Sequence, residues 1–361
     1  MAKLKVTFVK KDWPKWKNSR FWSYGAHLGI VDALRAEGAD VEVVDEAFLP
    51  SICSTSRRSD QIWFDDLVHI RHPAAWYEQA SRIAPIRVGW LIESLNYTQD
   101  EWSYEPELEH ERKISVYKRL PYMTHAVACD EVDAREIEEH VGIPGFWAPF
   151  SVPDLALRRS SPILNPSALF CGTVYGTRAR YLGMPELQGM TRMLVSDEDS
   201  SIYRWLFEGA EAWKRFVHWP RCGLAVAAYN KLNAKCREEL YRCFLTALQG
   251  GAAVINLRHL VKTYSPRVVE AMAVGRPVIS WRIPSRAKNL SLFQDGEEIL
   301  LYDEGDFAGF AELVTRTTTD RKESERIAVQ ARKRVAALHT TRCRVRQVLR
   351  WIQDGTTPYS L

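Results

Sequence analysis

Apolar residues recur along the chain with two different periods. They occupy every second position near the amino terminus, which predicts a strand over 3–9. Segment 25–38 spaces them at helical intervals and ends at Gly38, a residue that readily takes the left-handed conformation that closes a helix. The strand pattern resumes at 41–45. A strand, a helix and a second strand in succession predict the opening of a parallel α/β sheet.

The same alternation continues to the carboxyl terminus. In the first half it predicts strands at 86–92, 124–129 and 145–150 and a charged helix over 130–142. In the second half it predicts strands at 168–172, 225–229, 252–256, 277–281 and 298–302, and helices over 236–251, from Pro266, and over 326–352. Several of these strands are nearly continuous apolar runs, which is typical of parallel sheets covered by helices on both faces.

The segment 151–167 separates the two halves. It contains three prolines and shows no periodicity, so we interpret it as a linker. The chain has 361 residues, about twice the length of a typical domain. We therefore predict an α/β protein with an amino-terminal domain over 1–155, a second domain over 156–330, and a closing helix over 331–361.

Composition narrows the class of protein only a little. The hydrophobic fraction of 46% and the charged fraction of 26% are ordinary for globular proteins. No apolar run is long enough to span a membrane, and the amino terminus lacks an apolar secretory segment, so we expect a cytoplasmic protein without a transmembrane segment. The seven scattered cysteines form no Cys-x-x-Cys pair and predict neither a zinc site nor a redox motif.

The most informative motif is YSPRVVEAMAVGRPVIS, residues 264–280. Ser265 suits a helix N-cap and Pro266 the first helical position, so a short helix would begin in a loop, where free N–H groups attract a phosphate. Arg267 adds a cation in the first turn. Glu270 places a carboxylate where it could accept hydrogen bonds from ribose hydroxyls. Local features alone fit a capped surface helix with a solvated glutamate equally well.

This motif resembles the donor-binding helix of retaining glycosyltransferases of the GT-B fold. Their pattern ends in Glu-Ala-x-Ala-x-Gly-x-Pro-Val, and its glutamate matches Glu270, which the resemblance makes a ribose ligand. The acid that precedes it by eight positions falls on Lys262, a departure that favours the spore-maturation (CgeB-like) group. The segments ALFCGTVYGTRARYL and HAVACDEVDAREIEEHVG are also similar to that group. The resemblance implies two Rossmann-like domains facing across a cleft, with a carboxyl-terminal helix packing back.

Further candidates surround this motif in the predicted second domain. Gly172 follows a strand and lacks a Cβ, so its backbone could approach a pyrophosphate, although an ordinary tight turn fits as well. Arg178 could neutralise the phosphates, and Tyr175 could stack on the base. The full set of expected donor-binding residues is Gly172, Thr173, Tyr175, Arg178, Tyr264, Ser265, Arg267 and Glu270.

Candidate catalytic and acceptor residues lie in the first half. Glu93 follows a predicted strand and would lie at its carboxyl end, where ligands of parallel sheets bind. Asp130 and His125 flank another strand and are weaker candidates for catalysis. The loop 10–21 follows the first strand and alternates rings with cations, so we expect Trp13, Trp16 and Arg20 to contact the acceptor. A solvated loop fits the same pattern.

The function predicted by this resemblance is transfer of a sugar from a nucleoside diphosphate donor, a UDP-sugar by preference, to a hydroxyl acceptor. The acceptor could be a glycan, a natural product, a protein or a modified nucleic-acid base. A net charge of +4 gives little support to nucleic acid. We expect no metal and no cofactor besides the co-substrate. A nucleotide-sugar epimerase or hydrolase and a catalytically silent binding protein are the alternatives, and the sequence does not indicate the oligomeric state.

Overall fold

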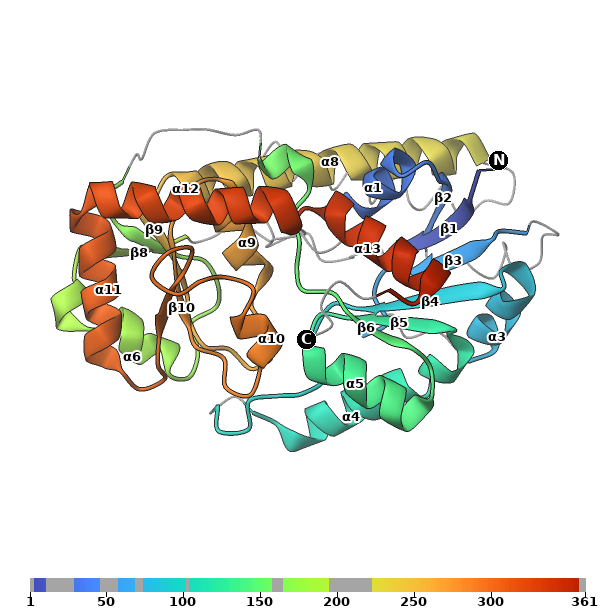
Figure 1. Cartoon of the computed structure of the whole chain (residues 1–361), viewed down its shortest axis with the longest axis horizontal. Coiled ribbons are helices and arrows are strands. Elements are labelled where there is room, and N and C mark those ends of the chain that lie inside the picture. Colours follow the sequence, from blue (N-terminus) through green and yellow to red (C-terminus); the bar gives the residue numbers. More distant parts are fainter. Residues whose placement is uncertain are drawn as a thin grey trace.

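The computed structural model contains two α/β halves joined side by side (Figure 1). The part of the chain that the structure describes comprises residues 3–10, 29–45, 58–68, 74–101, 104–157, 165–194 and 223–356. Each half is built around its own sheet, and every pairing in both sheets is parallel. This agrees with the predicted α/β class.

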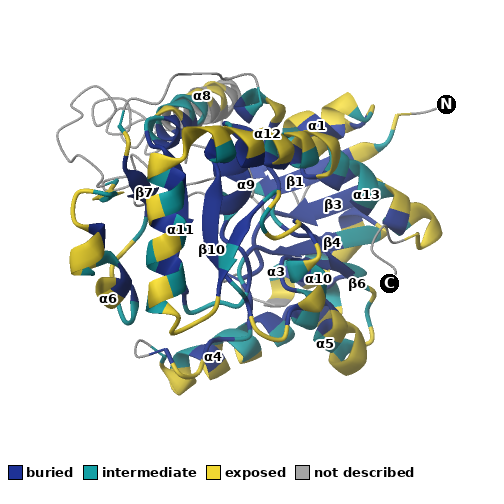
Figure 2. Cartoon of the chain, turned by 60° about the vertical axis from the view of Figure 1, so that its left-hand side comes forward, coloured by how far each residue is buried: buried dark blue, intermediate teal, exposed yellow. Residues whose placement is uncertain are grey.

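The sheet of the amino-terminal half has the strand order β2-β1-β3-β4-β5-β6. Its strands are β1 (Lys5–Lys10), β2 (Asp40–Asp45), β3 (Gln61–Phe64), β4 (Ile86–Leu91), β5 (His125–Ala128) and β6 (Gly145–Trp147). The central strands are buried on both faces, as their apolar sequences require (Figure 2). The helices of this half are α1 (Ile30–Ala36), α3 (Ala74–Ile83), α4 (Pro106–Tyr117) and α5 (Glu131–Val141).

The sheet of the carboxyl-terminal half has the order β11-β10-β9-β7-β8. Its strands are β7 (Ala168–Phe170), β8 (Thr191–Met193), β9 (Ala253–Asn256), β10 (Val278–Trp281) and β11 (Leu300–Tyr302). The helices are α6 (Arg178–Leu182), α8 (Gly223–Gln249), α9 (Pro266–Ala273), α10 (Ala287–Leu290), α11 (Phe307–Thr319) and α12 (Arg321–Leu338). In Figure 1, α8 runs along one side of this half and extends over the amino-terminal half near α1.

The last helix, α13 (Thr341–Asp354), returns to the amino-terminal half (Figure 1). Its buried residues Val345, Val348 and Trp351 belong to the same apolar cluster as the strands of that half. The Trp351 ring packs against Phe146 with centroids 5.1 Å apart. The carboxyl-terminal segment therefore completes the core of the domain that the amino-terminal segment begins.

Two described segments that pass between the halves, the linker and the start of α13, are bonded to each other. Val152 forms a parallel bridge with Thr340. The Val152 N–H donates to the His339 carbonyl at 3.0 Å, and the Thr341 N–H donates to the Val152 carbonyl at 2.7 Å. The linker and the start of α13 therefore cross the boundary together.

The structure corrects three of the expected elements. The apolar run at 225–229, expected as a strand, lies within α8, because a short run of small apolar residues suits a helix as well as a strand. The helix expected over 326–352 is two helices, since Thr340 caps α13 with its side chain on the Cys343 N–H. The expected set of strands was also incomplete, because it lacked β3, whose carboxyl end is followed by Asp65 and Asp66.

Candidate functional site

The carboxyl ends of β7 and β9 lie side by side, because the two strands are adjacent and parallel. Gly172 follows β7, and Arg258 follows β9. Ligands of open α/β sheets bind beyond these strand ends. The loops that leave β7 and β9 therefore form the first candidate site.

Gly172 brings its backbone close to two arginines. A Cβ at this position would lie 3.7 Å from Nη2 of Arg267 and 3.8 Å from Nη1 of Arg178. It would also approach the Phe170 ring at 3.3 Å, so the position has little room for a side chain. The Gly172 backbone therefore lies beside the guanidinium groups of Arg178 and Arg267, and its expected approach to a pyrophosphate stays a prediction.

Arg178 is held firmly in this site. Its Nε donates to the Arg258 carbonyl and its Nη1 to the Thr173 carbonyl, both at 2.7 Å. Its guanidinium also lies over the Tyr175 ring, 4.1 Å from the centroid. Burial lowers the pKa of Arg178 to about 10, which still leaves the side chain a cation near neutral pH.

Arg267 and His259 extend this group of nitrogen-bearing side chains. Among the described residues, Arg267 forms no ion pair within 4.0 Å. His259 is buried, and its pKa falls to about 3 because of burial and the nearby cations of Arg178 and Arg267. Its Nε2 lies 3.1 Å from the Thr263 carbonyl, which identifies that nitrogen as the donor. We call Gly172, Arg178, His259 and Arg267 the cationic cradle.

Helix α9 begins beside the cradle without a side-chain cap. Ser265 occupies the N-cap position, but its hydroxyl donates to Oδ1 of Asn256 at 3.0 Å instead of bonding to the helix. Asn256 in turn donates to Ser280 at 2.9 Å, so the hydroxyl is tied to the sheet. The positive end of the α9 dipole therefore adds to the charge of the two arginines.

Two expected donor ligands lie deeper than the cradle. Glu270 is 0% exposed, and with burial it raises the pKa of the neighbouring Tyr241 well above the usual range. Burial raises the pKa of Cys171, which precedes Gly172; nearby Arg267 opposes this rise and nearby Glu270 adds to it. Tyr264 is 4% exposed, and its ring packs 6.3 Å from that of Phe293. The structure therefore places the Tyr264 ring in the core.

Asp130, a candidate catalytic residue, joins the two halves through its contact with Arg286. Arg286 donates to it through Nε at 2.6 Å and Nη2 at 2.9 Å. Ser94 donates at 2.6 Å and the Val132 N–H at 3.0 Å. The Asp130 side chain is 0% exposed, and in this structure its hydrogen bonds join the two halves.

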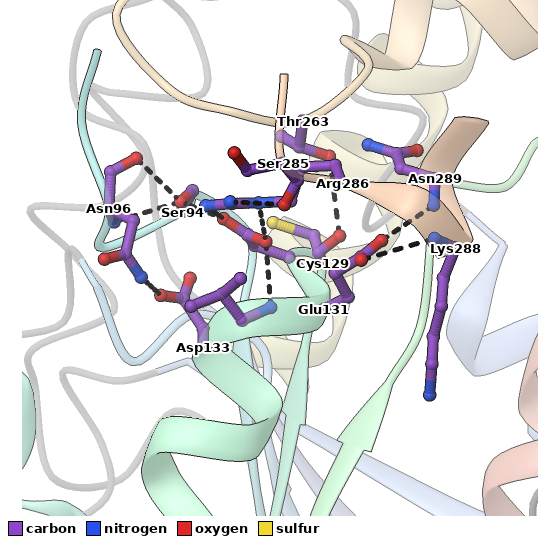
Figure 3. Close-up of polar contacts among 12 residues, drawn as sticks. Ser94, Asn96, Cys129, Glu131, Asp133, Thr263, Ser285, Arg286, Lys288 and Asn289 are labelled. Atoms are coloured by element: carbon purple, nitrogen blue, oxygen red, sulfur yellow. Dashed lines mark hydrogen bonds and ion pairs between the residues drawn. The ribbon is translucent and has the colours of Figure 1, made fainter. Parts of the chain in front are cut away.

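The neighbouring Glu131 makes a second contact between the halves. Its carboxylate accepts hydrogen bonds from the backbone N–H groups of Lys288 at 3.3 Å and Asn289 at 2.7 Å (Figure 3). These groups lie in the first turn of α10. The N-terminus of α10 is therefore filled by a carboxylate of the other half.

The other two catalytic candidates differ in position. Glu93 follows β4 at its carboxyl end, is 37% exposed, and pairs with Nη1 of Arg112 at 2.6 Å. His125 is the first residue of β5 and lies at the opposite edge, where its ring packs 5.0 Å from Trp351. His125 therefore lies at the amino end of its strand, away from the carboxyl ends where ligands of parallel sheets bind.

The amino-terminal half contains a cavity of about 880 Å³ next to α8. Lys10 and Asp65 line it at the carboxyl ends of β1 and β3, and Lys231 and Lys235 line it from α8. Trp13, Trp16 and Arg20, the expected acceptor contacts, lie outside the described residues. Within the described ranges no group of three His, Cys, Asp or Glu side chains could hold a metal ion.

Arg258 and Arg286 are the prominent side chains that the sequence did not single out. Both are buried, and both form ion pairs with carboxylates of the amino-terminal half. Arg258 lies just beyond the carboxyl end of the strand 253–256. The rule that ligands bind at such strand ends, which made Glu93 a candidate, could therefore have identified Arg258 as well. Arg286 follows Ser285, whose φ of 61° is the only positive value at a non-glycine among the described residues.

Comparison with known proteins agrees with this architecture. A family model described as "Glycosyl transferase-like" matches residues 199–350. No curated protein matches the chain. Within the part of the chain that the structure describes, no helix is both long and apolar enough to cross a membrane.

Several solved structures share the whole fold. Anabaena HepE in complex with UDP-glucose superposes with a TM-score of 0.57 at 12% identity, covering 97% of this chain and 99% of that one. Sucrose-phosphate synthase from Thermosynechococcus elongatus gives 0.58 at 12% identity, covering 98% and 100%. A glycosyltransferase from Rickettsia africae gives 0.55 at 10% identity, covering 98% and 99%. The chain therefore has the GT-B fold, as the sequence predicted.

Proposed function

We propose that this protein is a glycosyltransferase that moves a sugar from a nucleoside diphosphate sugar to a hydroxyl acceptor. The observation that carries the proposal is the cationic cradle. Gly172, Arg178 and Arg267 meet beside the uncapped start of α9, at strand ends where this fold class binds ligands. The match of residues 199–350 to a glycosyltransferase-like family model and the shared fold support the same assignment.

A UDP-sugar is the donor we favour, because HepE, which shares the fold, was solved with UDP-glucose. The diphosphate would lie against the Gly172 backbone and Arg267, and Glu270 would accept hydrogen bonds from the ribose. Thr173, Tyr175 and Ser265 would complete the donor pocket. The resemblance of the α9 segment to the spore-maturation group is our reason for proposing that the anomeric configuration is retained.

Stabilisation of the departing diphosphate is the chemical task of the cradle. Negative charge develops on the leaving oxygen as the bond to the sugar breaks, and preorganised cations stabilise it there. Arg178 and Arg267 provide this charge without a metal ion, so we propose a reaction that needs none. Of the three catalytic candidates, Glu93 is the best placed to interact with the acceptor hydroxyl, since it is partly exposed at a strand end.

The acceptor would bind on the amino-terminal half. The 880 Å³ cavity is large enough for a sugar-containing acceptor, and Lys10 at its rim precedes the segment with Trp13, Trp16 and Arg20. We favour a carbohydrate or other small hydroxyl compound over nucleic acid. The charged groups of the cavity support this, because Lys235 and Arg242 already pair with Glu238.

A donor panel tests the proposal directly. Thermal unfolding is measured with UDP, GDP and TDP and with their glucose conjugates, and a bound ligand at about 100 times its Kd should add about 2.7 kcal/mol to the native state. Product formation is then followed for each stabilising donor, with and without acceptors and in the presence of a chelator. Turnover that requires an acceptor supports a transferase. Turnover without acceptor indicates a hydrolase or epimerase, and binding without turnover a silent binding protein.

A further inference from the structure

Arg258 connects acidic residues of both halves through one buried side chain. Its guanidinium is 4% exposed and pairs through Nη2 with Asp100 and through Nη1 with Glu304. Its Nε lies 3.6 Å from a carboxylate oxygen of Glu101, which is 0% exposed. Asp100 and Glu101 belong to the amino-terminal half, and Glu304 to the carboxyl-terminal half. Arg258 therefore has a complete set of counter-charges only when the two halves are in contact.

The backbone of Arg258 supports the cationic cradle. Its carbonyl accepts the 2.7 Å hydrogen bond from Nε of Arg178. Two residues later, the Leu260 N–H donates to the Tyr175 hydroxyl at 3.4 Å, and Tyr175 lies under the Arg178 guanidinium. A displacement of the segment at Arg258 would therefore displace Arg178 as well.

The same segment is bound along its length by the amino-terminal half. The Thr98 N–H donates to the Leu260 carbonyl at 2.7 Å, and the Thr98 hydroxyl donates to the His259 carbonyl at 3.1 Å. Tyr97 and Val261 form an antiparallel bridge. The segments 97–101 and 258–261 thus make a two-stranded contact that leads directly from one half to the cradle of the other.

We infer that Arg258 is a positioning residue that couples contact between the two halves to anion binding in the cradle. When Asp100 and Glu101 engage Arg258, its carbonyl holds Arg178 in place for the ligand. Coupling between two sites is reciprocal, so a diphosphate that engages Arg178 also favours contact between the halves. The inference rests on the proposed function, because the proposed ligand of the cradle is the diphosphate of the donor.

The test compares Arg258 with two control arginines. Arg258→Lys keeps the charge but cannot reach all three carboxylates. Arg282→Lys is a control for an arginine with two acidic partners, Asp295 and Asp303, inside one half. Arg286→Lys is a control for a buried arginine that joins the halves at Asp130 without a described contact to the cradle. Titration calorimetry with UDP and thermal unfolding are measured for each.

We expect Arg258→Lys to weaken UDP binding about five- to thirty-fold, in the range of coupling carried by residues away from a ligand. Arg282→Lys should bind UDP within about two-fold of the parent, and Arg286→Lys, which weakens the contact between the halves away from the cradle, should lose less than Arg258→Lys. Asp100→Asn removes an exposed partner of Arg258 and leaves Arg258 itself in place. This variant still tests the coupling if Arg258→Lys fails to fold. Its effect should have the same direction, and the double variant should lose less than the product of the two single effects.

The outcomes separate this inference from the proposed function. If the parent binds UDP and Arg258→Lys binds it equally well, or if Arg286→Lys loses as much, the coupling is refuted while the proposed function stands. Independent effects of Arg258→Lys and Asp100→Asn would refute it too. If the parent binds none of UDP, GDP and TDP, the proposed function fails, and this inference fails with it.

Discussion

Helices α9 and α10 both begin at the boundary between the two halves, but their N-termini are treated differently. The N-terminus of α10 is filled by Glu131, a carboxylate of the opposite half. The N-terminus of α9 has no side-chain cap, because Ser265 bonds to the sheet, and two arginines lie nearby. A helix N-terminus attracts an anion in both cases. At α10 this anion is Glu131, which joins the two halves, and at α9 we propose that it is the diphosphate of the donor.

The largest expected effect concerns the contact between the halves beside the N-terminus of α10. Arg286→Met leaves Asp130 buried without its counter-charge and should cost about 3–5 kcal/mol of the free energy of unfolding. UDP affinity of the folded fraction should fall less than in Arg258→Lys, because Arg286 joins the halves but has no described contact with the cradle. Urea unfolding and UDP titration check both parts. Arg282→Met, at an exposed pair, is the matched control and should cost at most about 1 kcal/mol.

The next largest effect concerns the region proposed for the ligand. Arg267→Ala should weaken binding of UDP by about 1.5–3 kcal/mol, because a charged hydrogen bond to the diphosphate is lost. Inorganic pyrophosphate should be weakened equally, and thermal stability should hardly change, since Arg267 forms no ion pair within the described residues. Arg180→Ala, an exposed arginine of α6, should bind UDP like the parent. Unchanged UDP binding in Arg267→Ala would contradict the cradle.

A smaller effect separates the ribose from the diphosphate. Glu270→Gln should weaken UDP binding by about 1 kcal/mol, because an amide accepts hydrogen bonds from ribose hydroxyls less strongly than a carboxylate does. Pyrophosphate binding should stay the same, in contrast to Arg267→Ala. Calorimetry with both ligands makes the comparison. If stability falls instead and UDP affinity does not, Glu270 serves only to pack beside Tyr241.

The smallest effect concerns the return of α13 to the amino-terminal half. Arg346 and Arg342 hold the pKa of Glu37 down at about 2, from an ordinary 4.5. A lowered pKa means that this pairing stabilises the protein above about pH 4.5 and is lost as the pH falls toward 2. Glu37→Gln should therefore cost about 1 kcal/mol or less near neutral pH and nothing at about pH 2. Urea unfolding at both pH values measures this, and an equal cost at both would contradict it.

The sequence predicted most of what depends on local pattern. The strands around 41–45, 86–91 and 278–281 follow directly from apolar runs, and Gly172 and Arg267 were found because they sit where a strand ends or a helix begins. His125 was misplaced because periodicity locates a strand without showing which end of it faces the site. The strand predicted at 225–229 was wrong because the length and composition of this apolar run suit a helix as well as a strand.

Contacts between distant segments could not be predicted in this way. Arg258 and Asp100 lie far apart in the chain, as do Arg286 and Asp130, and no local pattern links their charges. The burial that turns these ordinary charged residues into strong pairs exists only once both halves are folded and in contact. A single sequence therefore points to candidate residues at individual strand ends, but not to the carboxylates of the other half that pair with Arg258 and Arg286.

The bridge between Val152 and Thr340 has a mechanical consequence. A protein whose halves are joined by one flexible strand can twist and slide about that strand. Here the two connecting segments are held together by hydrogen bonds from the Val152 and Thr341 N–H groups. Twisting one half relative to the other would break these hydrogen bonds, whereas bending at the paired segments would keep them. We therefore expect any relative movement of the halves to bend at these paired segments instead of twisting about one of them.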